Sequence, residues 1–175
     1  MKILVTGAKG FIGKNLIAEL RNRKYNDIFE FDKDTEYSLL EDYCKGVDFV
    51  FHLAGVNRPE VQSEFMEGNF GFTSDLLNAL KKNNNKCPVM ISSSIQASLG
   101  NPYGLSKKYG EDLLKDYNKE TGAKILIYRF QNIFGKWCRP NYNSAIATFC
   151  YNIARNSPIT VNNPDVIMNL IYIDD

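Results

Sequence analysis

The sequence predicts an α/β protein with a doubly wound parallel sheet. Short apolar runs alternate with longer segments whose apolar residues recur at helical spacing, which is typical of strand-helix-strand units. The runs are apolar along their length, as strands are when helices cover both faces of a sheet. Polar or small residues follow these runs, at the edge where doubly wound sheets bind their ligands.

The first unit of the alternation is a strand, a glycine turn and a helix. The apolar run at 3–5 predicts the strand, and three glycines within 7–13 predict the turn. Apolar residues then recur on one helical face from 12 to about 23. This order places the glycine turn at the carboxyl end of the first strand.

The remaining elements continue the alternation to the end of the chain. Strands are predicted at 28–31, 47–53, 89–91 and 125–128, each followed by polar or small residues. Helices are predicted around 76–80, at 103–117 and at 144–155, and a last apolar run covers 167–173. The length of 175 residues suits a single domain.

Composition and charge exclude several classes of protein. The 21 basic and 20 acidic residues leave a net charge of +1, so we expect neither a nucleic acid nor a membrane surface as partner. The four cysteines are far apart and His52 is the only histidine, which predicts no metal site. No apolar stretch is long enough for a signal peptide or a membrane span, so we expect a cytoplasmic protein.

The glycine turn has the spacing of a dinucleotide-binding loop. Its glycines allow a tight turn and close backbone approach, so that a pyrophosphate can lie on the N-terminus of the following helix. The flanking strand and helix favour this interpretation over a glycine turn without a ligand. With residues from the other strand ends, the predicted cofactor-binding set is Gly7, Lys9, Gly10, Phe11, Ile12, Gly13, Asp32, Lys33, Leu53, Ala54, Gly55, Asn69 and Lys107.

A tyrosine and a lysine one helical turn apart form a second constellation. Tyr103 and Lys107 share a face of the helix that follows the strand running into Ser94. Composition alone predicts one such pair, and its place above the ligand edge gives it meaning. Ketone reduction needs a proton donor, and an ordinary phenol pKa of about 10 is high for that task. We therefore predict Tyr103 as the acid, Lys107 as the cation that lowers its pKa and reaches the cofactor ribose, and Ser94 as the residue orienting the substrate carbonyl.

Further polar residues follow the strand ends and are candidates for the substrate side. Asn57 and Arg58 lie just after the third strand, where an arginine suits a diphosphate, although a plain polar loop fits as well. Gln131 and Asn132 could line the substrate side. Asn69 either faces the nicotinamide half of the cofactor or lies on a helix surface. His52 is predicted as a core or strand-end histidine rather than a catalyst.

Short segments together resemble the extended short-chain dehydrogenase/reductase family. They are T-G-A-K-G-F-I-G (6–13), H-L-A-G (52–55), S-S-S (92–94) and Y-G-L-S-K (103–107). The longer segments 52–60, 92–97, 101–107 and 134–156 resemble the N-terminal reductase domain of the capsular-polysaccharide reductases in that family. The resemblance implies an NAD(P)-binding Rossmann fold, with a dinucleotide-binding domain at 1–135 and the last sheet strands and the start of a substrate-binding region at 136–175. It also implies that the chain is a fragment of a homodimeric protein with a C-terminal cupin domain.

The resemblance further implies an activity, namely NADPH-dependent reduction of the 4-keto group of a UDP-linked 2-acetamido-2,6-dideoxy-hexulose to UDP-N-acetyl-6-deoxy-L-talosamine. A nucleotide-sugar 4-epimerase or dehydratase of the same superfamily is an alternative, although dehydratases usually have an acidic pair where Ile95 and Gln96 stand. A non-catalytic dinucleotide sensor is another alternative, although such proteins typically lose the tyrosine or the lysine.

Two signals disagree on the cofactor. Asp32, at the end of the second strand, suits the unphosphorylated ribose of NAD(H). Lys33 and Lys9 instead offer cations to the 2′-phosphate of NADP(H). The resemblance favours NADP(H), with NAD(H) as the alternative.

Overall fold

The computed structural model describes all 175 residues, and they form two compact units. The first unit is Met1–Phe130 and the second is Gln131–Asp175. We expected a boundary after residue 135. The two units are described separately below.

The first unit contains a five-stranded sheet in which all neighbouring strands are parallel. Its order is β2-β1-β3-β4-β5. The strands are β1 (Ile3–Thr6), β2 (Ile28–Phe31), β3 (Phe49–His52), β4 (Val89–Ser94) and β5 (Ile125–Phe130). β4 is longer than predicted, because Ser92, Ser93 and Ser94 continue its pairing with β5.

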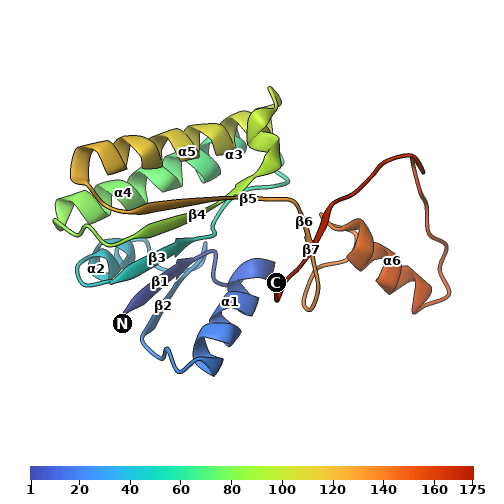
Figure 1. Cartoon of the computed structure of the whole chain (residues 1–175), viewed down its shortest axis with the longest axis horizontal. Coiled ribbons are helices and arrows are strands. Elements are labelled where there is room, and N and C mark those ends of the chain that lie inside the picture. Colours follow the sequence, from blue (N-terminus) through green and yellow to red (C-terminus); the bar gives the residue numbers. More distant parts are fainter. The chain divides into compact units, whose positions relative to one another are not determined.

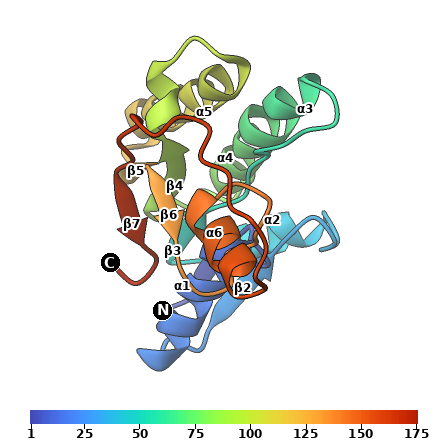
Figure 2. The same cartoon turned by 90° about the vertical axis from the view of Figure 1, so that its right-hand side faces the viewer.

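Helices connect the strands and cover both faces of this sheet. They are α1 (Phe11–Asn22), α2 (Leu39–Cys44), α4 (Phe72–Lys82) and α5 (Pro102–Thr121). The short helix α3 (Ser63–Phe65) and the π-helix η1 (Met66–Gly71) lead into α4, and the 3-10 turn η2 (Ile95–Ser98) leads toward α5. Figures 1 and 2 show α4 and α5 on one face of the sheet and α1 on the other, which confirms the doubly wound architecture.

Two apolar clusters pack against the two faces, because successive strand residues point to opposite sides. Leu4 belongs to the larger cluster, which includes residues of α2, α4 and α5. Its neighbours Ile3 and Val5 pack with Ile17 and Leu20 of α1. Burial on both faces explains why the strands are continuous apolar runs in the sequence.

The order of the strands fixes where a ligand can bind. The chain passes from β1 to β2 on one side of β1, and then continues with β3 on the other side. Ligands of doubly wound sheets bind at such a switch point, outside the carboxyl ends of the strands. The two strand-end loops touch there, since a Cβ added to Gly7 would lie 2.7 Å from the backbone nitrogen of Ala54. Gly7 also has a φ of +68°, which glycine tolerates best.

The second unit consists of β6 (Asn132–Phe134), α6 (Ala145–Ile153) and β7 (Leu170–Tyr172). β6 and β7 form their own parallel two-stranded sheet. The last apolar run therefore becomes a strand, as the sequence indicates, but it is shorter than 167–173 and pairs with β6. An apolar run predicts a buried strand without naming its partner, so this pairing was not accessible from the sequence.

Candidate functional site

The first turns of α5 carry the tyrosine and the lysine of the candidate site. Asn101 begins this helix, because its side-chain oxygen accepts a hydrogen bond from the backbone N–H of Gly104 at 2.7 Å, and Pro102 takes the first helical position. Tyr103 and Lys107 follow one turn apart, and Lys107 Nζ lies 5.9 Å from the centre of the Tyr103 ring. The helix therefore brings the phenol and the ammonium group together.

Ser94 completes this group from the neighbouring strand. It is the last residue of β4 and is buried, and its hydroxyl lies near enough to the Tyr103 phenol to lower the pKa of that group. The same oxygen accepts the backbone N–H of Gln96 at 3.2 Å, which begins η2. The serine is thus fixed by the turn that it caps, and the structure brings Ser94, Tyr103 and Lys107 together.

Burial sets the protonation of the tyrosine and the lysine. It raises the pKa of Tyr103, and the nearby Ser94 hydroxyl lowers that pKa in part. Burial also lowers the pKa of Lys107 to about 8. We expected Lys107 to lower the Tyr103 pKa, but Lys107 Nζ donates to the Ser92 carbonyl at 3.2 Å and the effect of burial dominates. Tyr103 therefore keeps its proton at neutral pH, which suits a proton donor.

The glycine loop has the geometry that a dinucleotide pyrophosphate requires. A Cβ on Gly13 would lie 2.2 Å from the Gly7 carbonyl oxygen, so the helix packs closely over the turn. Gly10 is the N-cap of α1 and offers no side-chain cap, which leaves the first N–H groups of the helix, around Phe11 and Ile12, for an anion. The residues present fit a dinucleotide.

Acidic and basic side chains meet beside this loop. Asp32 accepts hydrogen bonds from the backbone N–H groups of Lys9 at 2.7 Å and of Lys33 at 2.9 Å. The Lys9 side chain forms an ion pair with Asp34, and both partners are more than half exposed. Exposed ion pairs contribute little to stability, so Lys9 can exchange this partner for a ligand phosphate. Asp32, which suits the ribose of NAD(H), thus lies beside Lys9 and Lys33, which suit the 2′-phosphate of NADP(H).

The side chain of Asn69 holds the loop after β3 through hydrogen bonds to its backbone. Residues 53–56 begin this loop, among them Leu53, Ala54 and Gly55, and Asn69 on η1 is 4% exposed. The Asn69 amide accepts from the backbone N–H of Val56 at 2.9 Å and donates to the Val56 carbonyl at 3.0 Å. Of the two sequence alternatives for Asn69, a position on a helix surface is excluded, since the side chain is buried beneath the loop.

The predicted substrate residues lie in two places. Asn57 and Arg58 are exposed in the loop that follows β3 in the first unit. Gln131 and Asn132 are exposed in the second unit, where Asn132 donates to the backbone carbonyl of Asn169 at 3.1 Å. Their substrate roles stay predictions.

Sequence reasoning missed the hydrogen-bond partners of the buried polar residues around the site. His52 is 1% exposed, as a core histidine should be, and it lies between the hydroxyls of Thr6 and Thr73. Ser106 connects Asn69 to the Tyr103 carbonyl. No spacing rule links these residues, although a threonine or a histidine inside an apolar strand is itself a signal that a buried hydrogen bond is needed.

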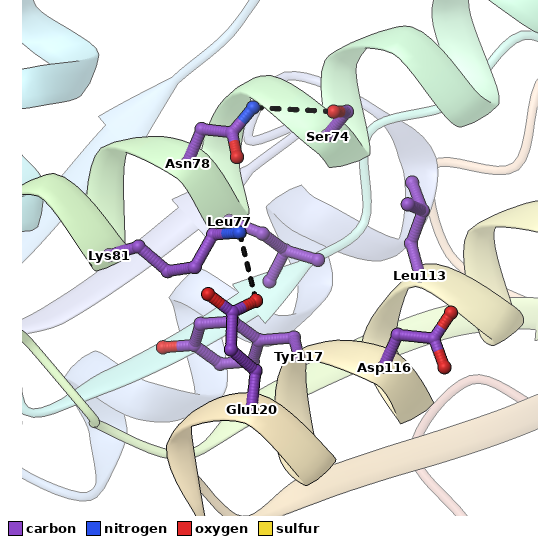
Figure 3. A pocket seen from close by; sticks show the side chains of 8 residues that line it. All are labelled: Ser74, Leu77, Asn78, Lys81, Leu113, Asp116, Tyr117 and Glu120. Atoms are coloured by element: carbon purple, nitrogen blue, oxygen red, sulfur yellow. Dashed lines mark hydrogen bonds and ion pairs between the residues drawn. The ribbon is translucent and has the colours of Figure 1, made fainter.

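A separate pocket lies between α4 and α5 and carries none of the predicted residues. Figure 3 shows its lining, with Lys81 donating to Glu120 at 3.1 Å across the two helices. The lining residues of α5 come from its C-terminal half, whereas Tyr103 and Lys107 lie in its first half. The pocket residues are Ser74, Leu77, Asn78, Lys81, Leu113, Asp116, Tyr117 and Glu120.

Two further properties concern membranes and metals. None of the helices combines the length and the apolar character that crossing a bilayer demands. No group of three His, Cys, Asp or Glu side chains lies close enough together to hold a metal ion.

Comparison with known proteins gives close relatives. A UDP-2-acetamido-2,6-beta-L-arabino-hexul-4-ose reductase of Pseudomonas aeruginosa is 47% identical over 100% of this chain and 47% of its own length. The crystal structure of the capsular polysaccharide assembling protein CapF from Staphylococcus aureus superposes with a TM-score of 0.89 at 51% identity, over 99% of this chain and 47% of that one. A UDP-glucuronic acid 4-epimerase from Bacillus cereus in complex with NAD has a TM-score of 0.87 at 22% identity, over 99% of this chain and 69% of that one, which shows a shared fold.

The resemblance seen in the sequence is confirmed by these findings. The chain spans about half the length of the reductase and of CapF. Residues 3–175 match the NAD dependent epimerase/dehydratase family, which agrees with the parallel sheet, the glycine loop and the tyrosine-lysine pair. The chain belongs to the NAD dependent epimerase/dehydratase family.

Proposed function

We propose that this chain forms the cofactor-binding part of a sugar-nucleotide reductase. The reaction is NADPH-dependent reduction of the 4-keto group of a UDP-linked 2-acetamido-2,6-dideoxy-hexulose, giving UDP-N-acetyl-6-deoxy-L-talosamine. The observation that carries the proposal is the grouping of Ser94, at the end of β4, with Tyr103 and Lys107 of α5, where Lys107 Nζ lies 5.9 Å from the centre of the Tyr103 ring. The relative that is 47% identical is named for reduction of such a hexul-4-ose, which supports the substrate class.

Each of the three side chains has its own task in this reaction. Tyr103 gives its phenolic proton to the substrate O4 as the carbonyl becomes a hydroxyl. Ser94 holds the same oxygen through its hydroxyl and stabilises the phenolate that is left behind. Lys107, with a pKa of about 8, is mostly charged at neutral pH and can donate to the cofactor ribose while bonded to Ser92. A bound reduced nicotinamide dinucleotide would supply the hydride.

The glycine loop and its neighbours would hold the cofactor. The N-terminus of α1 suits the pyrophosphate, and the loop after β3 lies against the glycine loop at the switch point. We favour NADP(H) over NAD(H), because both Asp32 carboxylate oxygens already accept backbone N–H groups while Lys33 and Lys9 stand beside them. The cations can then meet a 2′-phosphate.

The remaining candidates concern the sugar nucleotide. Arg58 and Asn57 lie in the exposed loop after β3 and suit the diphosphate, and Gln131 and Asn132 would lie on the sugar side. A dehydratase is disfavoured, because Ile95 and Gln96 follow Ser94 and neither can act as an acid or base.

Substitution of the proton donor tests the reaction. Tyr103→Phe in the purified protein should lose at least about a hundredfold in turnover of a UDP-4-keto-6-deoxy-N-acetylhexosamine, with cofactor binding close to normal. Tyr109→Phe is the matched control, since Tyr109 is an exposed tyrosine on the same helix. Turnover of Tyr103→Phe within a few-fold of wild type would remove Tyr103 from the mechanism.

Calorimetric titration tests the cofactor. We expect NADPH to bind more tightly than NADH at low salt, and Lys33→Glu to narrow or reverse that difference. Lys124→Glu serves as control, because Lys124 directly precedes β5 and so lies at the opposite edge of the sheet. If the wild type binds NADH as tightly as NADPH or more tightly, the proposed cofactor becomes NAD(H) and no longer NADP(H).

A further inference from the structure

His52 connects, through hydrogen bonds, the residues that hold the loop after β3 with residues of η1 and α4. It is the only histidine of the chain, stands at the end of β3 and is 1% exposed. Both ring nitrogens have a partner, since Nδ1 is 2.7 Å from Thr6 Oγ1 and Nε2 is 2.8 Å from Thr73 Oγ1. The proposed proton transfer does not use this ring. A buried imidazole with a partner at each nitrogen links those partners rigidly.

The hydrogen bonds around the ring fix its tautomer. The Thr73 hydroxyl donates its one hydrogen to the Asn69 carbonyl at 2.6 Å, so it can only accept from His52. Nε2 therefore carries the ring hydrogen, and Nδ1 accepts from the Thr6 hydroxyl. The Thr6 oxygen in turn accepts the backbone N–H of Ala54 at 3.3 Å. The bonds run in one direction, from the loop after β3 to η1.

The charge state of the ring agrees with this direction. Burial, together with the positive charge of Lys107 on α5, holds the pKa of His52 at about 3. The neighbours from the other packed elements are the uncharged Thr6 of β1, and Thr73 and the Phe72 ring of α4, whose centre is 5.5 Å away. His52 is consequently neutral, which lets Nδ1 accept a hydrogen bond.

The two ends of this chain of hydrogen bonds hold the same loop. At one end Thr6 holds Ala54, and at the other Asn69 holds Val56 through both its amide oxygen and its amide nitrogen. Between them, a Cβ on Gly55 would lie 2.6 Å from Asn69 Oδ1 and 2.8 Å from Lys107 Nζ. The loop, Asn69 and Lys107 are therefore packed without spare room, so a shift of one moves the others.

We propose that His52 is a positioning residue. As a neutral Nε2–H tautomer it links Thr6, which holds Ala54, to Asn69, which holds Val56. It thereby sets the positions of loop 53–56 and of Lys107 for the cofactor. The tautomer follows from the hydrogen bonds alone. The effect on ligand binding rests on the proposed function, because it takes the ligand to be a nicotinamide dinucleotide.

The tautomer is measured directly by ¹⁵N NMR of histidine-labelled protein, in which the single imidazole needs no assignment. We expect one Nε2–H tautomer that does not titrate between about pH 5 and 8. Thr73→Val removes the acceptor of Nε2–H and should shift the ring toward Nδ1–H, which can donate to Thr6. Thr121→Val is the matched control, since Thr121 also donates to the carbonyl four residues earlier at 2.6 Å but faces no histidine. An Nδ1–H tautomer, or titration near the ordinary pKa, in the wild type would overturn the proposal.

Titration with NADPH and NADH measures the positioning effect. Thr73→Val should weaken binding about tenfold, Thr73→Ser should restore it, and Thr121→Val should leave it unchanged. If the wild type binds neither nucleotide, the proposed function fails while the tautomer still stands on the NMR result. If the wild type binds and Thr73→Val binds within about twofold of it, His52 does not position the site. Should Thr73→Val not fold, the wild-type NMR spectrum and Thr73→Ser decide the question.

Discussion

The burial of His52 predicts that the protein loses stability between neutral and mildly acid pH. The pKa of this histidine falls from 6.5 to about 3 in the folded chain. The unfolded chain therefore binds one more proton between these values, so stability is present above about pH 6.5 and is lost as the pH falls below it. The slope is about 1.4 kcal/mol per pH unit well below 6.5, which amounts to about 2 kcal/mol between pH 7 and 5.

The ion-paired carboxyl groups of the fold do not mask this effect. The ordinary carboxyl pKa values are 3.8 and 4.5, and those of Glu111, Asp112 and Asp34 are lowered further by their cationic partners. Urea unfolding at pH 7, 6 and 5 should show the loss, and His52→Asn, which cannot titrate, should not. Calorimetry of wild-type unfolding in buffers of different ionisation heat should find uptake of about one proton at pH 5. A flat wild-type profile without proton uptake would refute a neutral, buried His52.

Three further predictions concern the helix that carries the site, its lysine and the glycine loop. Glu111 is buried and receives two hydrogen bonds at 2.7 Å from the Arg129 guanidinium and one at 2.6 Å from Ser93, so Glu111→Gln should cost about 2–3 kcal/mol in urea unfolding, more than Asp112→Asn at its half-exposed neighbour. Lysine is charged below its pKa, so the affinity for the cofactor should fall as the pH rises through about 8. The Lys107→Met variant should bind the cofactor more weakly, with an affinity that does not depend on pH in this range. A wild-type affinity that is constant from pH 7 to 9 would contradict this prediction. Gly13→Ala should lower the free energy of unfolding by at least about 1 kcal/mol and weaken cofactor binding. Gly100→Ala should change neither stability nor binding, because a Cβ there meets nothing within 4 Å.

The parts of the fold that sequence reasoning predicted are those with strong periodicity. β2 has the predicted bounds, and α5 begins one residue before the prediction, because Asn101 caps it and Pro102 is its first residue. The helical turns at 63–71 were missed, since this segment has glycines at 68 and 71 and no continuous apolar face. α2 was missed as well, because six residues are too short for a periodic pattern.

The site was predictable where fixed spacing expresses its chemistry. The glycine loop follows β1 and Ser94 ends β4, while Tyr103 and Lys107 lie on α5 at a spacing that helix geometry explains. The direction of the Tyr103 pKa was not predictable in this way, because it depends on how deeply the phenol is buried. Partners such as Thr6 and His52, 46 residues apart, meet only because β1 and β3 are neighbours in the sheet.

The buried polar residues of the first unit lie mostly near the carboxyl ends of three strands. The buried polar set includes Thr6, His52, Asn69, Thr73, Ser92, Ser93, Ser94, Ser106, Lys107 and Glu111, and its members lie in the last residues of three strands and in the helices packed beside them. Burying such groups costs free energy unless each finds a partner, and an apolar edge would be the simpler way to a stable fold. Here each has a partner, so the positions of Tyr103, Lys107 and the loop after β3 are fixed before any ligand arrives. The apolar clusters lie elsewhere in the fold, so this cost of burial is concentrated at one edge of the sheet, and we therefore place the proposed reaction there and not in the pocket between α4 and α5.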